Sequence, residues 1–302
     1  MALANWPARL VRRLLRRPAA EPRDWPTGLI ELADGVFAYV QAGGGLCVSN
    51  AGLIVGPDGC IVIDALFAPS MTRALREEIA RVTDKPVRLL VNTHHHIDHT
   101  LGNALFPEAQ IVSHVNARRE QERVGASVLD LLRPRVPELV ADAEGIEPRL
   151  ADVTFDGELA LHLTGRTVRL LHLGTAHTIG DALVLLPDDK LLFAGDVAFH
   201  SVTPLAFEGH VGGWLDVCDQ IDALDVATIV PGHGPVGGKA ELRDMRGYLE
   251  SIHQQARAAF GAGRSQEEAT ESIDLGDYAS WTEPERLALN VARLYQEFRE
   301  EI

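Results

Sequence analysis

The sequence predicts an α/β protein in which two mixed β-sheets pack face to face and helices cover the outer sides. Two observations lead to this fold class. Short apolar runs typical of strands occur in two groups along the chain, and each group is followed by segments with helical periodicity. The 302 residues, of which 46% are hydrophobic, also supply enough apolar surface for one large core or two smaller ones.

The first group of expected strands begins at residue 29 and is divided by turn dipeptides. Asp34-Gly35 and Asp58-Gly59 lie between apolar runs, and glycine adopts positive φ at little cost. A helix is expected over residues 69–82, because Leu75, Ile79 and Val82 recur at three-to-four spacing. The expected strands cover residues 29–32, 36–41, 47–55, 60–64 and 87–91.

The second group of strands lies beyond a polar, helix-prone stretch at residues 115–141. Strands are expected at residues 159–163, 167–173, 182–186, 190–194 and 227–230, and helices at about 212–224, 239–261 and 283–300. We therefore divide the chain into a basic arm at residues 1–26 and a catalytic domain at residues 27–302. Residues 239–302 form the helical C-terminal portion of that domain.

The charge of the chain disfavours a nucleic-acid-binding function. There are 43 acidic and 28 basic residues, for a formal net charge of -15, whereas a nucleic-acid surface needs a concentrated basic face. The exception is the arm, which contains Arg9, Arg12, Arg13, Arg16 and Arg17 and no acidic residue within its first 20 positions. This arm is either a solvated terminus or a docking segment for an acidic partner.

The sequence shows no signal peptide and no apolar run long enough to span a membrane, so we expect a cytoplasmic protein without a membrane partner. Its three cysteines, Cys47, Cys60 and Cys218, form no CxxC pair. Any metal site should therefore be built from histidine and carboxylate ligands.

A histidine-rich motif follows the expected strand at residues 87–91. It reads His94-His95-His96-Ile97-Asp98-His99, and side chains two positions apart in such a loop can point to one side. Imidazole nitrogens and carboxylate oxygens are ligands that zinc prefers in proteins. Three further residues, His177, Asp196 and His233, lie where loops leave expected strands, beside glycines that permit close backbone approach. The spacing favours two neighbouring metal ions.

This pattern resembles the metallo-β-lactamase-fold hydrolase superfamily over residues 29–235. The resemblance implies an αββα sandwich with the site at the sheet edges. It also implies one metal held by His94, His96 and His177, a second held by Asp98, His99 and His233, and a bridging carboxylate from Asp196. We also count Asp98 among the catalytic residues.

Two zinc ions at such a site would activate a shared water near neutral pH and polarise a carbonyl, so no serine or cysteine nucleophile is needed. Iron or manganese also suits histidine and carboxylate ligands. The chemistry that this site favours is therefore hydrolysis of a carbonyl substrate.

Within the superfamily the chain is most similar to the actinorhodin-type second-ring cyclase/thioesterases of aromatic polyketide pathways. The matching stretches are residues 25–29, 38–53, 92–103 and 195–214. The resemblance implies a partly cyclised polyketide held as a thioester on an acyl carrier protein, which one site would cyclise and release. The basic arm would then dock the acidic carrier protein.

Other functions stay open. A glyoxalase II-like enzyme, or another small thioester, ester or lactone hydrolase, shares the ligand set. A secreted β-lactamase fits less well, because Asp196 stands where those enzymes have cysteine or serine and because no export signal is seen. A metal-bound protein that binds a partner without turnover is the alternative from another class. The sequence does not indicate the oligomeric state.

Several residues near the ligands are further candidates. His200 follows Asp196 by four positions and is expected to act as a general acid or to hold a substrate oxygen, unless it is a structural loop histidine. Phe207 and Trp214 form a pocket wall or pack the following helix, and His95 should point away from the metals. Thr93, Thr178 and Asp181 are expected to orient ligand imidazoles.

Overall fold

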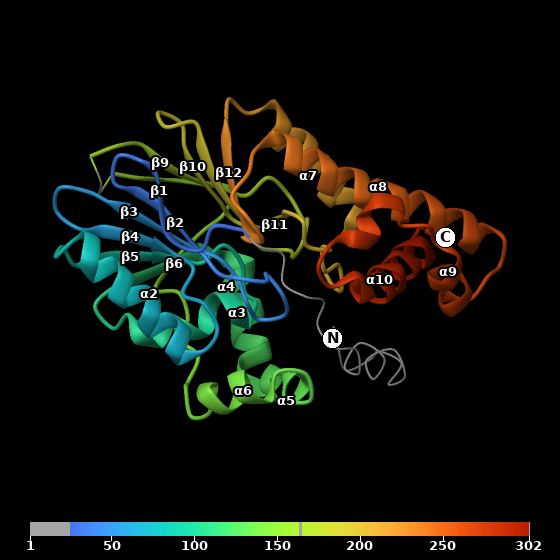
Figure 1. Cartoon of the computed structure of the whole chain (residues 1–302), viewed down its shortest axis with the longest axis horizontal. Helices are drawn as coiled ribbons and strands as arrows, with labels where there is room; N and C mark the ends of the chain where they lie inside the picture. The colour runs from blue at the N-terminus through green and yellow to red at the C-terminus, as the bar shows by residue number, and fades with distance from the viewer. Residues whose placement is uncertain (1–24, 163–164, 302) are drawn as a thin grey trace.

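The computed structural model describes residues 25–162 and 165–301, so most of the arm expected at residues 1–26 lies outside the described residues. Two β-sheets pack against each other, and helices cover both outer sides (Figure 1). This arrangement confirms the predicted fold class. Among the described helices, none is long and apolar enough to cross a membrane.

The first sheet has seven strands in sequential order. They are β1 (Gly28–Ala33), β2 (Val36–Val40), β3 (Ala51–Val55), β4 (Cys60–Ile63), β5 (Val87–Val91), β6 (Gln110–His114) and β7 (Val153–Phe155). Strands β1 to β4 are antiparallel hairpin neighbours, whereas β4 to β7 run parallel. Helix α2 (Pro69–Val82) buries Leu75 and Ile79 against the outer face of this sheet, as its periodicity predicts, whereas Val82, the third residue of that pattern, is exposed.

The second sheet has five strands in the order β12-β11-β10-β9-β8. They are β8 (Glu158–Leu161), β9 (Val168–Leu171), β10 (Leu183–Leu186), β11 (Leu191–Phe199) and β12 (Thr228–His233). Strands β11 and β12 are parallel, and the other pairs are antiparallel. Buried side chains from both sheets, such as Ile54 and Ile63 on one and Val184 and Phe193 on the other, fill the space between them.

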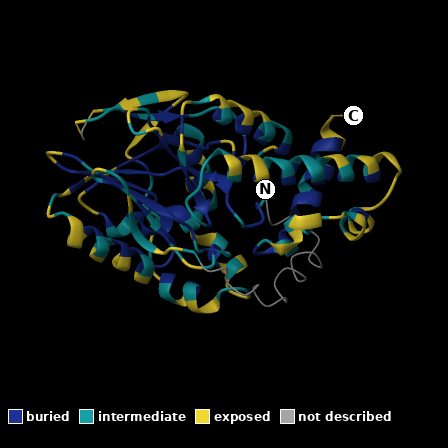
Figure 2. Ribbon diagram, turned by 45° about the horizontal axis from the view of Figure 1, so that its top comes forward, coloured by how far each residue is buried: buried dark blue, intermediate teal, exposed yellow. Residues whose placement is uncertain are grey.

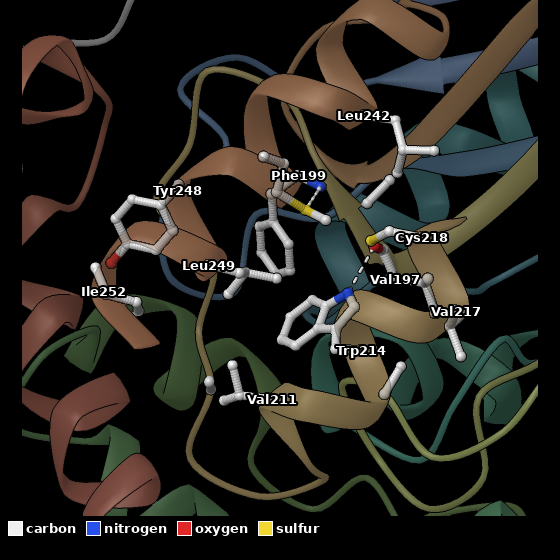
Figure 3. Close-up of a cluster of buried hydrophobic side chains, with 14 of the residues drawn as sticks. Val197, Phe199, Val211, Trp214, Val217, Cys218, Leu242, Tyr248, Leu249 and Ile252 are labelled. Atoms are coloured by element: carbon white, nitrogen blue, oxygen red, sulfur yellow. Dashed lines mark hydrogen bonds between the residues drawn. The ribbon is translucent and has the colours of Figure 1, made fainter. Parts of the chain in front are cut away.

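The helices that cover the second sheet form the largest core. They are α7 (Val211–Ala223), α8 (Lys239–Gly261), α9 (Gln266–Ser272) and α10 (Leu287–Glu300). Trp214 is fully buried here beside Phe199 and donates its Nε1–H to the Val197 carbonyl oxygen at 2.9 Å (Figure 3). Exposed residues concentrate on the outward faces of the helices, and the strands between them are largely buried (Figure 2). Trp214 therefore packs α7 onto the core, whereas Phe207 forms part of a pocket wall.

Residues 97–105 and 115–143, on either side of β6, form a group of short helices over one end of the first sheet (Figure 1). They are α3 (Ile97–Thr100), α4 (Val115–Val124), α5 (Val128–Leu132) and α6 (Pro137–Ala143), with 3-10 helices η2 (Leu101–Leu105) and η3 (Gly125–Ser127). Two further 3-10 helices, η4 (Gly276–Ser280) and η5 (Pro284–Arg286), precede α10. Leu129 and Val140 from α5 and α6 pack on Phe67 and Leu101 in a small cluster separate from the main core.

The strand expected at residues 47–55 begins only at Ala51. Residues 47–50 leave the sheet because they bind the end of β12: the Asn50 amide N–H donates to the Gly232 carbonyl oxygen at 2.7 Å. The Asn50 side chain also donates to the Pro231 and Gly234 carbonyl oxygens, at 3.0 and 2.8 Å. The local apolar pattern indicates strand propensity, but these contacts between distant segments determine the backbone conformation of residues 47–50.

Candidate metal centre

All seven ligands expected from the sequence converge at one edge of the two sheets. His94 and His96 lie in the loop after β5, and Asp98 and His99 lie in the single turn of α3. The other three lie in the second sheet or its loops: His177 follows β9, Asp196 is in β11 and His233 ends β12. The structure therefore brings together side chains that lie up to 139 positions apart in the sequence.

The first set of ligand atoms surrounds a common point. His96 Nδ1 lies 3.0 Å from His94 Nε2 and 2.9 Å from His177 Nε2. Asp196 Oδ2 lies 3.3 Å from His177 Nε2 and 3.9 Å from His94 Nε2. A tetrahedral zinc ion with bonds of about 2.0–2.1 Å would separate its ligand atoms by about 3.3 Å. The four atoms therefore have the spacing of a tetrahedral site.

The second set shares Asp196 with the first. His233 Nε2 lies 3.4 Å from Asp98 Oδ2, and His99 Nε2 lies 4.0 Å from the same oxygen. Asp196 Oδ1 is 3.1 Å from His99 Nε2, and Asp196 Oδ2 is 3.4 Å from His233 Nε2. Because its two oxygens reach both sets, Asp196 has the position of a bridging carboxylate.

The residues present fit a pair of divalent cations. His99 Nε2 and Asp196 Oδ1 are buried and make no hydrogen bond within the described part of the chain. Buried polar atoms are normally paired, and nitrogen and carboxylate donors together suit zinc. A bound cation would satisfy both atoms.

Protonation differs among the ligands. Burial, with neighbouring imidazoles, lowers the pKa of His94 well below its usual value, and burial lowers the pKa of His177 to about 3. Both rings are therefore neutral and able to ligate. Burial alone would lower the pKa of His96, His99 and His233, but nearby carboxylates raise it, so a cation must displace protons from these rings. Burial alone would raise the pKa of Asp98 and of Asp196, but the imidazoles of His99 and His233 hold it below the usual range, so both carboxylates are charged.

Asp64 orients one ligand of the second set and was missed by the sequence analysis. Its Oδ2 lies 2.8 Å from His99 Nδ1 and accepts from the Thr93 hydroxyl at 2.7 Å, while its Oδ1 accepts from the Thr93 amide N–H at 2.8 Å. With Nδ1–H donated to Asp64, His99 keeps a lone pair on Nε2 for the metal. One feature of the sequence could have identified Asp64: it ends the strand expected at residues 60–64, and this strand end lies at the sheet edge that carries the ligands.

The other predicted orienting residues divide into two groups. Thr93 Oγ1 lies 3.1 Å from His94 Nδ1, so Thr93 contacts an imidazole as expected. Thr178 and Asp181 bind each other instead: the Thr178 hydroxyl donates to Asp181 Oδ1 at 2.6 Å and its amide N–H donates to Oδ2 at 2.9 Å. This pair shapes the loop after His177 without contacting the ring.

Glu208 is a second contact that the sequence analysis missed. Its Oε1 lies 2.5 Å from His96 Nε2 and 2.9 Å from His95 Nε2. Burial would raise the pKa of Glu208, but the hydrogen bonds from the two imidazoles hold it far below the usual range. His95 therefore points away from the ligand sets, as expected, and contacts Glu208 instead. No local motif marks Glu208, which lies in a loop 112 positions after His96.

The structure does not bring His200 to the site. Its side chain is fully buried, it is absent from the lining of the cavity beside the ligands, and its Nδ1 lies 3.0 Å from the Pro235 carbonyl oxygen. Proximity in sequence to Asp196 was misleading because β11 ends at Phe199 and the chain turns toward the loop after β12. Of the two interpretations of His200, the structural one matches its position.

A cavity of about 170 Å³ opens beside the ligands. Five of the ligands line its floor, and its walls are largely apolar. One wall comes from α5 with Val128, Leu131 and Leu132, and another includes Leu205, Phe207 and Leu289. A neighbouring cavity of about 210 Å³ shares Phe207, Val128 and Leu131 with this lining.

A buried ion pair joins the two walls. Arg135 donates to Glu283 Oε2 at 3.0 Å and to Glu285 Oε1 at 2.7 Å, and these side chains are at most 9% exposed. Arg286 Nη1 donates to the Thr203 carbonyl oxygen at 2.9 Å, and its Nε lies 3.8 Å from Glu283. The arginine charges at this end of the cavity are thus balanced by carboxylates.

Gly232 is expected to be essential because it packs directly against Asp196. A Cβ atom at this position would lie 1.9 Å from Asp196 Oδ1 and 2.8 Å from the Asp196 amide nitrogen. Gly232→Ala should displace the bridging carboxylate, reduce bound zinc below two equivalents and lower the free energy of unfolding by about 1–3 kcal/mol. Metal analysis and urea unfolding measure the two effects.

The matched control for this substitution is Gly261→Ala, where an added Cβ meets nothing within 4 Å. It should leave zinc content unchanged and alter stability by less than about 1 kcal/mol. Full zinc binding by Gly232→Ala would contradict the close packing at Asp196.

Sequence comparison agrees with the fold and the ligand geometry. A family model described as the metallo-beta-lactamase superfamily matches residues 44–233. The chain therefore belongs to the metallo-β-lactamase superfamily.

Individual relatives differ in their named activities. A linear primary-alkylsulfatase from Pseudomonas sp. (strain ATCC 19151) is 25% identical over 74% of this chain and 49% of that protein. A 2,4-dinitroanisole O-demethylase subunit alpha from Nocardioides sp. (strain JS1661) is 25% identical over 67% of this chain and 54% of that protein. This chain thus spans about half the length of both relatives. A metallo-beta-lactamase type 2 from Bacteroides fragilis is 23% identical over 70% of this chain and 80% of that protein.

Solved structures show the same fold. A double mutant of the sec-alkyl sulfatase PisA1 superposes with a TM-score of 0.68 at 18% identity, covering 90% of this chain and 50% of that one. A metallo-beta-lactamase from Pontibacter korlensis superposes with a TM-score of 0.59 at 19% identity, covering 74% of this chain and 99% of that one.

Proposed function

We propose that this protein is a metal-dependent hydrolase of an acyl thioester with a bulky apolar acyl group. The observation that carries the proposal is the place of Asp196 between two ligand sets on the floor of an apolar cavity. Two divalent ions held there supply Lewis acidity that activates water and polarises a carbonyl group. Zinc matches the donor set.

The residues of the cavity select the substrate. Phe207, Leu205 and the leucines of α5 offer apolar contacts to an acyl chain or a flat ring system and exclude water from the reacting carbonyl. Because Arg135 is paired with two glutamates, the cavity presents no uncompensated positive charge from that residue. A neutral acyl group suits such a cavity better than a sulfate ester, although alkylsulfatases are among the relatives.

The finer proposal is a cyclase/thioesterase that closes a ring of an aromatic polyketide and releases it from an acyl carrier protein. It is supported by the resemblance of residues 25–29, 38–53, 92–103 and 195–214 to enzymes of that kind. The rings of a partly cyclised poly-β-ketone offer flat faces to the apolar walls, and its ketone and thioester carbonyls suit polarisation by bound cations. The arginine-rich arm would serve as the docking segment for the acidic carrier protein.

The test is product analysis by mass spectrometry with the zinc-loaded full-length chain. The substrates are a partly cyclised polyketide thioester, a short-chain acyl thioester, a secondary alkyl sulfate and a cephalosporin. We expect the polyketide thioester to be cleaved or cyclised fastest and the sulfate to stay intact. Asp98→Ala removes a ligand of the second set and should abolish the reaction.

Two results would count against this proposal in different ways. Cleavage of the alkyl sulfate or cephalosporin alone would replace the thioester assignment. Cleavage of the short thioester alone would retain the thioesterase and reject the polyketide substrate, leaving the glyoxalase II-like alternative.

A further inference from the structure

We infer that Glu208 is a positioning residue that fixes His96 as a ligand of the first metal ion. Glu208 lies outside the metal-binding motif of residues 94–99 and reaches the site from the loop between β11 and α7. The inference rests on the metal-dependent part of the proposed function and not on the substrate. Its test reads metal binding without substrate, so it can fail independently of the thioesterase proposal.

The two nitrogens of His96 face different partners. Nδ1 belongs to the first ligand set, 3.0 Å from His94 Nε2 and 2.9 Å from His177 Nε2, whereas Nε2 lies 2.5 Å from Glu208 Oε1. A carboxylate only accepts hydrogen bonds, so it holds the proton on Nε2 and leaves the Nδ1 lone pair for the metal. Without Glu208, the ring has no such bias between its two tautomers.

One contact of Glu208 and two contacts of its chain neighbours hold this loop in place. His95 Nε2 lies 2.9 Å from the same carboxylate oxygen. The neighbouring Phe207 ring stacks on His96, with centroids 4.9 Å apart and an angle of 22° between the planes. Gly209, at φ 71°, packs so closely that a Cβ there would lie 2.1 Å from the Ala176 carbonyl oxygen. This loop is therefore fixed against the segment that carries His177.

The first and second sets thus have separate carboxylate supports. Asp64 contacts His99 of the second set, and Glu208 contacts His96 of the first. Loss of Glu208 should therefore weaken one ion and spare the other. The same residues allow a competing interpretation, because ligand atoms of His95, His96 and Glu208 lie within 4.8 Å of one another and could themselves hold a cation.

The experiment compares Glu208→Ala and Glu208→Gln with the wild-type chain in metal-binding measurements. Affinities for zinc are obtained by chelator competition, and cobalt substitution gives absorption bands that report the ligand geometry. Glu208→Ala should weaken one ion by about 10- to 100-fold and alter its cobalt bands. Glu208→Gln keeps an acceptor oxygen and the side-chain size, so it should restore part of that loss.

The control is Glu122→Gln, an exposed glutamate on α4, which should bind both ions as the wild type does. Unchanged affinities and cobalt spectra in both Glu208 variants would overturn the inference. So would a third equivalent of bound metal in the wild type that disappears in Glu208→Gln, since Glu208 would then be a ligand.

Discussion

Asp196→Ala is expected to reduce bound zinc from two equivalents to at most one and to lower turnover at least about a thousandfold. The variant removes the only carboxylate among the described ligands whose two oxygens reach both sets, so two cations would face each other without its negative charge. A thousandfold loss corresponds to about 4 kcal/mol, within the several kcal/mol that metal catalysis supplies. Metal analysis and steady-state kinetics on an activated thioester measure the two effects.

The control for this variant is Asp216→Ala, which removes an exposed carboxylate on α7 from the same protein. It should retain both ions and full turnover. If Asp196→Ala kept two tightly bound ions, the bridging position inferred from its oxygens would be wrong.

Asp64→Asn is expected to weaken the second ion by about 10- to 100-fold while the protein stays folded. An amide in this place has one acceptor and one donor end, whereas its surroundings supply the Thr93 amide, the Thr93 hydroxyl and His99 Nδ1. If the amide nitrogen faces His99, the imidazole proton moves to Nε2 and blocks metal binding. In the flipped orientation the amide nitrogen opposes the Thr93 N–H, and an unsatisfied buried donor costs about 1–3 kcal/mol.

Zinc titration and urea unfolding of Asp64→Asn separate these two orientations, because one lowers metal affinity most and the other lowers stability most. Asp58→Asn changes an exposed carboxylate in a turn and should alter neither property. Wild-type metal affinity together with wild-type stability would show that Asp64 does not orient His99.

The fold was largely predictable because its pattern is local. Apolar runs and turn dipeptides mark most strands, and the spacing of Leu75 and Ile79 marks the helix that covers the first sheet. The errors have two causes: contacts between distant segments, and strands too short to show a pattern. Residues 47–50 have strand-like composition but bind the end of β12, and β7 is three residues long, too short to show an alternating pattern.

The motif at residues 94–99 was predictable as a metal site from its residue types and spacing, and the resemblance to the superfamily implied how all seven ligands divide between two metal ions. The supports of these ligands were not predictable, since a carboxylate that contacts an imidazole from 35 or 112 positions away has no signature of its own, as Asp64 and Glu208 show. His200 shows the opposite error, because the sequence suggested a site residue that the structure places elsewhere. A histidine near a ligand in sequence is attractive, but the turn at the end of β11 places it behind the site.

The cavity walls draw on side chains outside the main core, although Phe207 also stacks on the ligand His96. Leu132 of the α5 wall packs in the small cluster that contains Phe67 and Leu101, and Leu205 and Phe207 of the other wall pack against Leu289. Arg135 connects the walls to each other. Substitutions at Val128, Leu131 or Leu205, which line the cavity and are not ligands, are therefore expected to change the substrates that fit more than they change metal binding.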